Sequence, residues 1–231
     1  MTTIKKLQAE WEDIEHHHSY INELFCELVN ADPILKIHRD YIEQKAYGFG
    51  ERSFWYLWKL ILDEIPKGFS FLEIGVYRGS TISLIKLLRP DATVYGVTPL
   101  TSEGGYQDCD YAKDIADLHQ YFNLDQPNII KGLSNEPWAI QAVRDLGMRD
   151  VIYVDGAHDT ETVLQDLANY ASLVKIGGYL VMDDCNSEMH MPHGYFQGHQ
   201  SVTDAKLKWL ETQTDFEFVF SVVHISVFRK L

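Results

Sequence analysis

The stretch FSFLEIGVYRGSTISLIKLL, residues 69–88, decides the fold that we predict for this chain. Four of its first six residues are large and apolar, a short turn bounded by Gly75 and Gly79 follows, and apolar residues then recur at helical spacing. This order predicts a strand, a tight turn and a helix. Such a turn places backbone N–H groups and a helix N-terminus at the carboxyl end of a strand, where a ligand can approach closely.

Glu73 adds a carboxylate near the end of this predicted strand, where it could receive a hydroxyl or an ammonium group. The spacing is ExGxxxG rather than the GxGxxG of dinucleotide-binding proteins, so a nicotinamide cofactor is not the first choice. The alternative is an ordinary strand-to-helix turn whose glycines serve only close packing.

Toward the C-terminus, strand-like and helix-like segments alternate. Further strands are expected at residues 93–97, 128–131, 151–154 and 179–182, with helices at 111–122, 137–146 and 160–174. A helix at 201–211 then precedes two strand-like segments, 216–224 and 225–229, which predict a hairpin or a bent strand pair. We therefore predict an α/β fold over residues 68–231, with a doubly wound, mostly parallel seven-stranded sheet whose last strand is antiparallel.

Toward the N-terminus, apolar residues fall at three- and four-residue intervals, which predicts helices over residues 1–67. We expect this helical extension to act as a lid or as a dimer contact, and the protein to form a homodimer. One of its helices is rich in aromatic residues, and we expect most of them to cover the core rather than a ligand: Phe54, Trp55, Tyr56 and Trp58.

Composition and charge limit the possible partners. A chain of 231 residues with 45% hydrophobic content can bury one sizeable core. The 34 acidic and 20 basic residues give a net charge of −14, which argues against nucleic acid or an anionic membrane surface as a partner. A small-molecule substrate suits this charge better.

The cysteines and the N-terminal sequence indicate the compartment. Cys26, Cys109 and Cys185 are scattered and odd in number, so neither a disulfide framework nor a cysteine zinc site is predicted. The N-terminus has no apolar core of a signal peptide, and no apolar segment approaches the length of a membrane span. We expect a soluble, cytoplasmic protein.

An acidic cluster follows two neighbouring strands of the predicted sheet. Asp155 follows one strand, and Asp183 and Asp184 follow the next. Three carboxylates at one edge repel one another unless a cation lies between them, and a hard divalent ion fits this need, Mg²⁺ first, with Mn²⁺ or Ca²⁺ as alternatives. The competing interpretation is that these aspartates are helix caps or solvated loop residues.

Histidines lie beside these acids. His158 follows Asp155 by three residues, and an imidazole there could take a proton from a substrate; the alternative is a surface loop histidine. The segment MHMPHGYFQGHQ, residues 189–200, is rich in glycine, histidine and aromatic residues and is a candidate substrate lid. A zinc site built from its histidines is less favoured, because they lack a firm ligand spacing.

The segments LEIGVYRGST, IYVDGAH, TETVLQDL and GGYLVMDD resemble class I S-adenosylmethionine-dependent methyltransferases. Within that class they are similar to metal-dependent O-methyltransferases of natural-product biosynthesis, such as the macrocin and mycinamicin O-methyltransferases, and to cephalosporin-hydroxylase-like proteins. The resemblance covers residues 68–231.

The resemblance implies a role for individual residues. Glu73, Gly75 and Gly79, with the adjacent Ser80, match the motif that holds the methionine and ribose parts of S-adenosylmethionine, and Ser134 lies near the expected adenine position. The acids Asp155, Asp183 and Asp184 match the Mg²⁺ ligands, with Asp155 also beside the cofactor, and His158 matches the general base. At the position where the family usually has an acid for the ribose, this chain has Thr98, which lacks the charge assistance of a carboxylate.

These observations predict an S-adenosylmethionine-dependent and Mg²⁺-dependent O-methyltransferase that acts on a hydroxyl of a sugar, a polyketide or another natural product. Two alternatives remain open. One is a degenerate methyltransferase-like domain that only binds a partner, and the other is a metal-dependent hydroxylase or hydrolase on the same fold.

Overall fold

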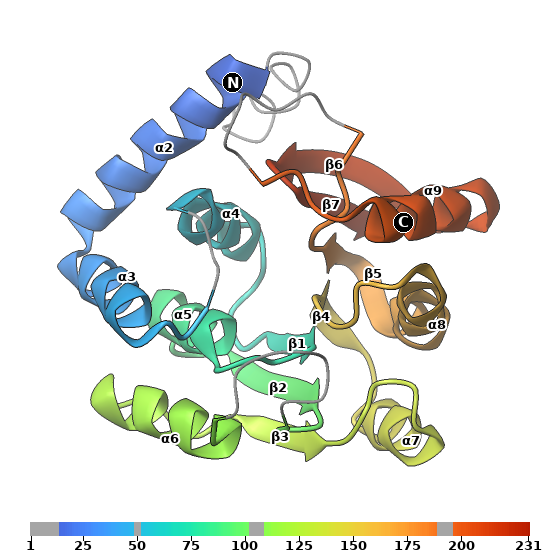
Figure 1. Ribbon diagram of the computed structural model, residues 1–231, viewed down its shortest axis with the longest axis horizontal. Coiled ribbons are helices and arrows are strands. Elements are labelled where there is room, and N and C mark those ends of the chain that lie inside the picture. Colours follow the sequence, from blue (N-terminus) through green and yellow to red (C-terminus); the bar gives the residue numbers. More distant parts are fainter. Residues whose placement is uncertain (1–13, 49–51, 102–108, 189–195) are drawn as a thin grey trace.

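The computed structural model describes residues 14–48, 52–101, 109–188 and 196–231 (Figure 1). The strands form one sheet in the order β3-β2-β1-β4-β5-β7-β6. Their bounds are β1 Ser70–Ile74, β2 Thr93–Thr98, β3 Asn128–Lys131, β4 Arg149–Val154, β5 Val174–Met182, β6 Phe216–Val222 and β7 Ile225–Lys230. The helices are α2 Ile14–Ala31, α3 Pro33–Lys45, α4 Arg52–Asp63, α5 Ser80–Leu88, α6 Tyr111–Tyr121, α7 Pro137–Asp145, α8 Thr160–Tyr170 and α9 Gln200–Thr212.

The sheet confirms the predicted fold class. Strands β1 to β5 pair in parallel, and β7 pairs antiparallel with both β5 and β6. Strand β4 is the neighbour of β5, as the grouping of the acidic residues requires. The carboxyl ends of β1, β4 and β5 therefore meet at one edge of the sheet, which is where ligands bind in folds of this kind.

Strand β5 begins earlier than predicted. The expected start was residue 179, but the strand begins at Val174, after α8 has ended at Tyr170 and a short 3-10 turn has followed. Its pairing with β4 is irregular between Arg149 and Val151, and Gly177 has a left-handed backbone with φ of 78°. This irregular first half carries no clean apolar alternation, so the sequence pattern indicates only the second half.

Both faces of the sheet are covered by helices, which explains why the central strands are apolar throughout. In Figure 1, helices α4, α5 and α6 lie on one side of the sheet and α7, α8 and α9 on the other. Phe71 and Tyr153 contribute to the core on the α4 side, whereas Leu72 and Ile152 contribute to the core on the α8 side. Successive side chains of one strand thus pack into two separate cores, one on each face of the sheet.

The aromatic helix α4 packs on the sheet, as predicted. Trp58 is fully buried, and its ring lies 5.3 Å from that of Phe71 and 5.0 Å from that of Tyr153. Phe54 and Trp55 are also buried. Most of these aromatic side chains therefore belong to the core.

The helical segment before the sheet contacts the glycine turn after β1. Arg78 in that turn donates to the carbonyl of Ala46 at the end of α3 (2.8 Å) and pairs with Asp114 on α6 (2.6 Å). The Tyr47 hydroxyl donates to the same Asp114 (2.9 Å). The predicted division near residue 67, and the use of these helices as a lid or dimer contact, stay predictions.

His38 of α3 makes stability depend on pH. Its ring is completely buried against Ser83 of α5 (2.8 Å), and burial, with smaller contributions from His119 and Arg39, lowers its pKa to about 3. The unfolded chain binds a proton at this histidine below about pH 6.5, whereas the folded chain does not, so stability falls as pH drops below that value. Between pH 7.5 and 5.5 we expect His38 to remove about 1.4 kcal/mol of unfolding free energy.

Urea unfolding of the wild type and of His38→Gln at both pH values checks this expectation. Other titrating groups contribute equally to both proteins, so the difference between the two pH dependences isolates His38. An identical pH dependence in both would contradict a neutral buried ring.

Within the part of the chain that the structure describes, no helix has both the length and the apolar character that a membrane crossing requires.

Candidate functional site

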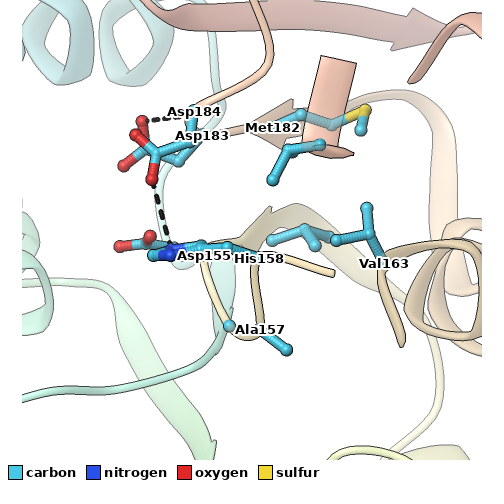
Figure 2. A pocket seen from close by; sticks show the side chains of 10 residues that line it. Asp155, Ala157, His158, Val163, Met182, Asp183 and Asp184 are labelled. Carbon is cyan, nitrogen blue, oxygen red and sulfur yellow. Dashed lines mark hydrogen bonds and ion pairs between the residues drawn. The ribbon is translucent and has the colours of Figure 1, made fainter. Parts of the chain in front are cut away.

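A pocket lies at the carboxyl ends of β4 and β5 (Figure 2). The backbone brings the predicted acids to it, because the N–H of Asp155 bonds the carbonyl of Ile74 (2.9 Å) and the N–H of Asp183 bonds that of Val154 (3.0 Å). These bonds extend the parallel ladders just beyond the strands. The pocket is lined by Val154, Asp155, Gly156, Ala157, His158, Val163, Met182, Asp183, Asp184 and Val202.

The glycine turn after β1 lies against the same loop. Gly75 has φ of 99°, and a Cβ atom added there would overlap the backbone carbonyl of Asp155. Gly79 has φ of 85° and forms the N-cap of α5, where the described residues provide no side-chain cap for the first turn of the helix. The turn therefore presents uncapped backbone N–H groups, which suit a carboxylate or another polar group of a ligand.

Glu73 is the buried acid beside this turn. Only 3% of the residue is exposed, and its Oε2 atom has no hydrogen-bond partner among the described residues. Burial, reinforced by the charge of Asp183, raises the pKa of Glu73 to about 8 despite a hydrogen bond from Thr81. A buried acceptor without a partner is costly, so this carboxyl group suits a ligand that brings donors.

The other predicted cofactor residues lie at the end of β2, after β3 and at the start of α5. Thr98 is buried at the end of β2, and its hydroxyl accepts the N–H of Leu100 (3.4 Å). Ser134 follows β3, and its carbonyl accepts the hydroxyl of Tyr170 (2.5 Å). Ser80 begins α5, where a Cβ atom added to Gly48 would come within 2.6 Å of its hydroxyl oxygen.

Asp183 and Asp184 form the centre of the acidic cluster. The N–H of Asp184 donates to Oδ1 of Asp183 (2.8 Å), and the hydroxyl of Tyr153 donates to Oδ2 of Asp183. Asp184 has a left-handed backbone with φ of 54°, a conformation that a non-glycine residue seldom adopts outside constrained sites.

The pKa values of the three acids shift in opposite directions. Burial works against ionisation of Asp183, but His224 and Tyr153 outweigh it and hold its pKa below the usual value. Burial and the charge of Asp183 raise the pKa of Asp184. Burial, and then the charges of Asp183 and Asp184, raise the pKa of Asp155 well above its usual range. The pocket thus concentrates more negative charge than it neutralises, which favours a bound cation.

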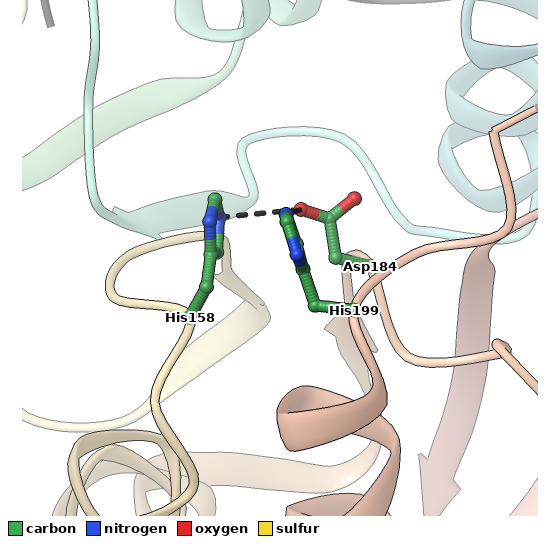
Figure 3. Close-up of side chains that lie close together, drawn as sticks. All are labelled: His158, Asp184 and His199. Carbon is green, nitrogen blue, oxygen red and sulfur yellow. Dashed lines mark ion pairs between the residues drawn. The ribbon is translucent and has the colours of Figure 1, made fainter. Parts of the chain in front are cut away.

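Three imidazoles surround Asp184. Nε2 of His158 lies 3.2 Å and Nε2 of His199 lies 3.7 Å from its Oδ2 atom. Nε2 of His224 lies 3.9 Å from its Oδ1 atom and 3.2 Å from Oδ1 of Asp183. The rings of His158 and His199 stack at 4.3 Å with 20° between their planes (Figure 3). Burial, together with the neighbouring His199, lowers the pKa of His158.

The backbone around residue 198 holds this arrangement. The N–H of His199 donates to the carbonyl of Asp184 (2.9 Å), and Cys185 forms a β-bridge with Gly198. A Cβ atom on Gly198, whose φ is 88°, would overlap the Asp184 carbonyl. The C-terminal end of the predicted lid loop is therefore fixed to the acidic cluster, whereas His190, His193 and Tyr195 lie outside the described residues.

The structure groups the predicted site residues in part. Asp155, His158, Asp183 and Asp184 line one pocket. Among the described residues, however, two sets of side chains have potential ligand atoms that all lie within 4.8 Å of one another. One set is His158, Asp184 and His199, and the other is Asp183, Asp184 and His224. Asp155 belongs to neither set.

Two residues of the site did not emerge from the sequence. His224 lies in the turn between β6 and β7, more than thirty residues from the acids, and Tyr153 has the alternating pattern of an ordinary core residue. A histidine in the tight turn of a predicted hairpin is the one signal that could have drawn attention to the first of them.

Comparisons with known proteins agree with the fold. Residues 72–185 match a family model described as a methyltransferase domain. An uncharacterized protein of Acanthamoeba polyphaga mimivirus is 29% identical over 154 residues, a match that covers 62% of this chain and 64% of that protein, and so less than two thirds of its length.

Solved structures share the architecture at low sequence identity. A caffeoyl-CoA O-methyltransferase-like protein from Staphylococcus aureus has a TM-score of 0.66 and 18% identity, covering 91% of this chain and 99% of that one. The MycE methyltransferase of mycinamycin biosynthesis, in complex with Mg, SAH and mycinamycin VI, has a TM-score of 0.53 and 18% identity, covering 79% and 50%. The O-methyltransferase NovP has a TM-score of 0.52 and 16% identity, covering 76% and 78%.

Proposed function

We propose that this chain transfers the methyl group of S-adenosylmethionine to a hydroxyl oxygen of a small molecule, such as a sugar, a polyketide or another natural product. The match of residues 72–185 to a methyltransferase-domain model, and the fold that the chain shares with solved O-methyltransferases, support this proposal. One observation supports oxygen as the atom that accepts the methyl group. An imidazole with a lowered pKa, that of His158, lies 3.2 Å from a buried carboxylate at the sheet edge that also carries the glycine turn.

The glycine turn fits S-adenosylmethionine. Glu73 offers a buried acceptor without a partner in the described structure, and Gly75 and Gly79 leave the turn and the N-terminus of α5 without side chains in the way. When bound, S-adenosylmethionine supplies a methyl group on a positively charged sulfur, which a nucleophilic oxygen can attack. The residues of the turn bind and orient this donor.

The acids fit a divalent cation, with Asp155, Asp183 and Asp184 as the proposed oxygen ligands and Mg²⁺ as the initial choice. They share one edge of the sheet, and the raised pKa values of Asp155 and Asp184 indicate uncompensated negative charge there. A bound cation would supply a positive charge that lowers the pKa of a substrate hydroxyl. The MycE structure, which has the same fold, contains Mg and SAH and supports this proposal.

His158 is proposed as the general base. Its Nε2 atom points at Asp184, so a hydroxyl held at the acids comes within reach of that nitrogen. The lowered pKa keeps the ring neutral and able to accept a proton near pH 7. The oxygen left by proton removal then attacks the methyl group in line with the departing sulfur.

Replacing this base should slow chemistry without disturbing binding. In His158→Ala we expect turnover to fall by roughly 10²–10⁴-fold, while S-adenosylhomocysteine binds as in the wild type, because the ring lies beside the acids rather than in the glycine turn. Single-turnover kinetics and calorimetry measure the two effects. Unchanged turnover in a folded variant would remove His158 from the reaction.

The activity itself is tested by mass spectrometry. The protein is incubated with S-adenosylmethionine, a divalent metal and a panel of hydroxylated sugars, macrolides and catechols. The expected result is a product with one added methyl group and an equal amount of S-adenosylhomocysteine. A metal-dependent product without the methyl group would indicate a hydrolase or hydroxylase, and absence of S-adenosylhomocysteine binding would indicate a domain that only binds a partner.

A further inference from the structure

We propose that His224 is a ligand of the cation site, together with Asp183 and Asp184, and that this site therefore prefers a first-row transition metal such as Mn²⁺ or Zn²⁺ to Mg²⁺. The inference rests on the proposed function, because it concerns the cation of that same site. It adds a ligand from the turn between β6 and β7 and changes the expected metal.

The distances fit a common ion. Two ligand atoms bonded to one ion at about 2.1 Å lie about 3.0 Å apart when they are adjacent in an octahedron. Nε2 of His224 is 3.2 Å from Oδ1 of Asp183 and 3.9 Å from Oδ1 of Asp184. The three ligand atoms all lie within 4.8 Å of one another, so a closing movement of the Asp184 carboxylate would bring them toward bonding separations.

The two oxygens of Asp184 face different histidines, and this separates binding from catalysis. Oδ1 faces His224, while Oδ2 faces His158 and His199. An ion on the Oδ1 side leaves His158 able to act as the base.

The second ligand set, His158 with Asp184 and His199, fits an ion less well. Its two imidazoles stack nearly parallel, as Figure 3 shows, so their in-plane lone pairs run side by side rather than converging on one point. A single ion would lie out of the plane of at least one ring. The stacked pair is therefore better suited to holding His158 in position.

The fold prepares His224 for this role. The ring is buried, with 8% of the residue exposed, and the turn that carries it is bonded to the chain just after β5. The N–H of Cys185 donates to the carbonyl of His224 (2.8 Å), and the side-chain amide of Asn186 donates to that of Val223 (3.0 Å). These bonds fix the imidazole relative to the acids before any ion arrives, which is what a selective site requires.

Hydrogen bonds also orient the carboxylate opposite His224. Asp183 receives the Tyr153 hydroxyl on Oδ2 and the Asp184 N–H on Oδ1. Such outer contacts fix the direction in which a ligand presents its remaining lone pair.

The donor set decides the metal. Mg²⁺ binds oxygen ligands and keeps much of its water, whereas imidazole nitrogen suits Mn²⁺, Fe²⁺, Co²⁺ and Zn²⁺ increasingly well. A buried imidazole added to the carboxylate ligands therefore favours a transition metal.

Metal binding to the stripped, full-length protein tests the inference without any substrate. Isothermal titration with Mn²⁺, Zn²⁺ and Mg²⁺ should give affinities at least about tenfold higher for the transition metals. Electron paramagnetic resonance of the Mn²⁺ form should show coupling to an imidazole nitrogen that disappears in His224→Asn. That variant should lose at least about tenfold in Mn²⁺ affinity, whereas the matched control His199→Asn should keep it.

A further variant keeps the test independent of folding defects. His224→Asp replaces the nitrogen donor by a further carboxylate and should shift the preference back toward Mg²⁺. Equal Mg²⁺ and Mn²⁺ affinities in the wild type, or nitrogen coupling that persists in a folded His224→Asn protein, would overturn the inference. If methyl transfer proceeds with Mg²⁺ and no nitrogen coupling is seen, the inference fails while the proposed function stands. If nitrogen coupling is present but no acceptor is methylated, the inference stands while the proposed function fails.

Discussion

Asp184→Ala is expected to lower methyl transfer by at least about a thousandfold, while S-adenosylhomocysteine still binds with wild-type affinity. Asp184 is the one residue that belongs to both sets of potential ligands, and it also lies 3.2 Å from the proposed base. Its loss removes a proposed cation ligand and the partner of His158 together. Initial rates with a saturating acceptor, and calorimetry with S-adenosylhomocysteine, measure the two properties.

Asp155→Ala is expected to act in the same direction. Asp155 shares the pocket and the unfavourable charge of the cluster, although it lies outside both compact ligand sets. The matched control is Asp159→Asn, which also removes a negative charge from this loop but keeps the cap of α8. We expect that variant to keep its activity. Full activity of Asp184→Ala, or of the wild type in excess chelator, would contradict a metal-dependent reaction.

Gly75→Ala is the second change for which we expect a large effect. The free energy of unfolding should fall by more than about 3 kcal/mol, and cofactor binding should be lost. The added Cβ atom would overlap the backbone carbonyl of Asp155, and φ of 99° is unfavourable for any L side chain. Backbone atoms cannot yield as a flexible side chain can, so β1 and the loop after β4 must separate. Chemical unfolding and a thermal-shift titration with S-adenosylhomocysteine measure both losses.

The control for Gly75 lies in the same part of the chain. Gly68 also has a left-handed backbone, with φ of 74°, but an added Cβ atom would meet nothing within 4 Å. Gly68→Ala should therefore cost only the backbone preference, about 1–2 kcal/mol, and should leave cofactor binding unchanged. Similar losses in the two variants would show that the close approach to Asp155 is unimportant.

The fold was predictable because its signals are local. The apolar stretch before Gly75 and the turn up to Gly79 predict a strand followed by a helix, and the repetition of this unit predicts a parallel sheet. The position of the acids also followed, because Asp155, Asp183 and Asp184 come directly after apolar strands and such strands end at one edge. The start of β5 was missed because its first residues pair through an irregular segment.

His158 was predicted beside the acids, but the contacts that His199 and His224 make with them could not be predicted in the same way. His224 reaches Asp183 only because β7 pairs with β5 and the turn before it folds toward the end of that strand. His199 reaches Asp184 through a backbone bridge at Gly198, which has no sequence pattern of its own. Contacts that depend on tertiary pairing leave no periodicity in the sequence, so they can be identified only from the three-dimensional arrangement of the strands.

The position of β7 between β5 and β6 has a consequence for the order of events during synthesis. Strand β6 leaves the ribosome before β7, yet in the sheet its described neighbour is β7, which joins it to β5. Until β7 has emerged, the nascent chain therefore carries β5 with one open edge and β6 without a place on the sheet. His224 reaches the acids only when β7 is inserted, so the proposed binding of a transition metal should appear only with the final folding step. Metal capture by ribosome-bound chains of increasing length would date that step.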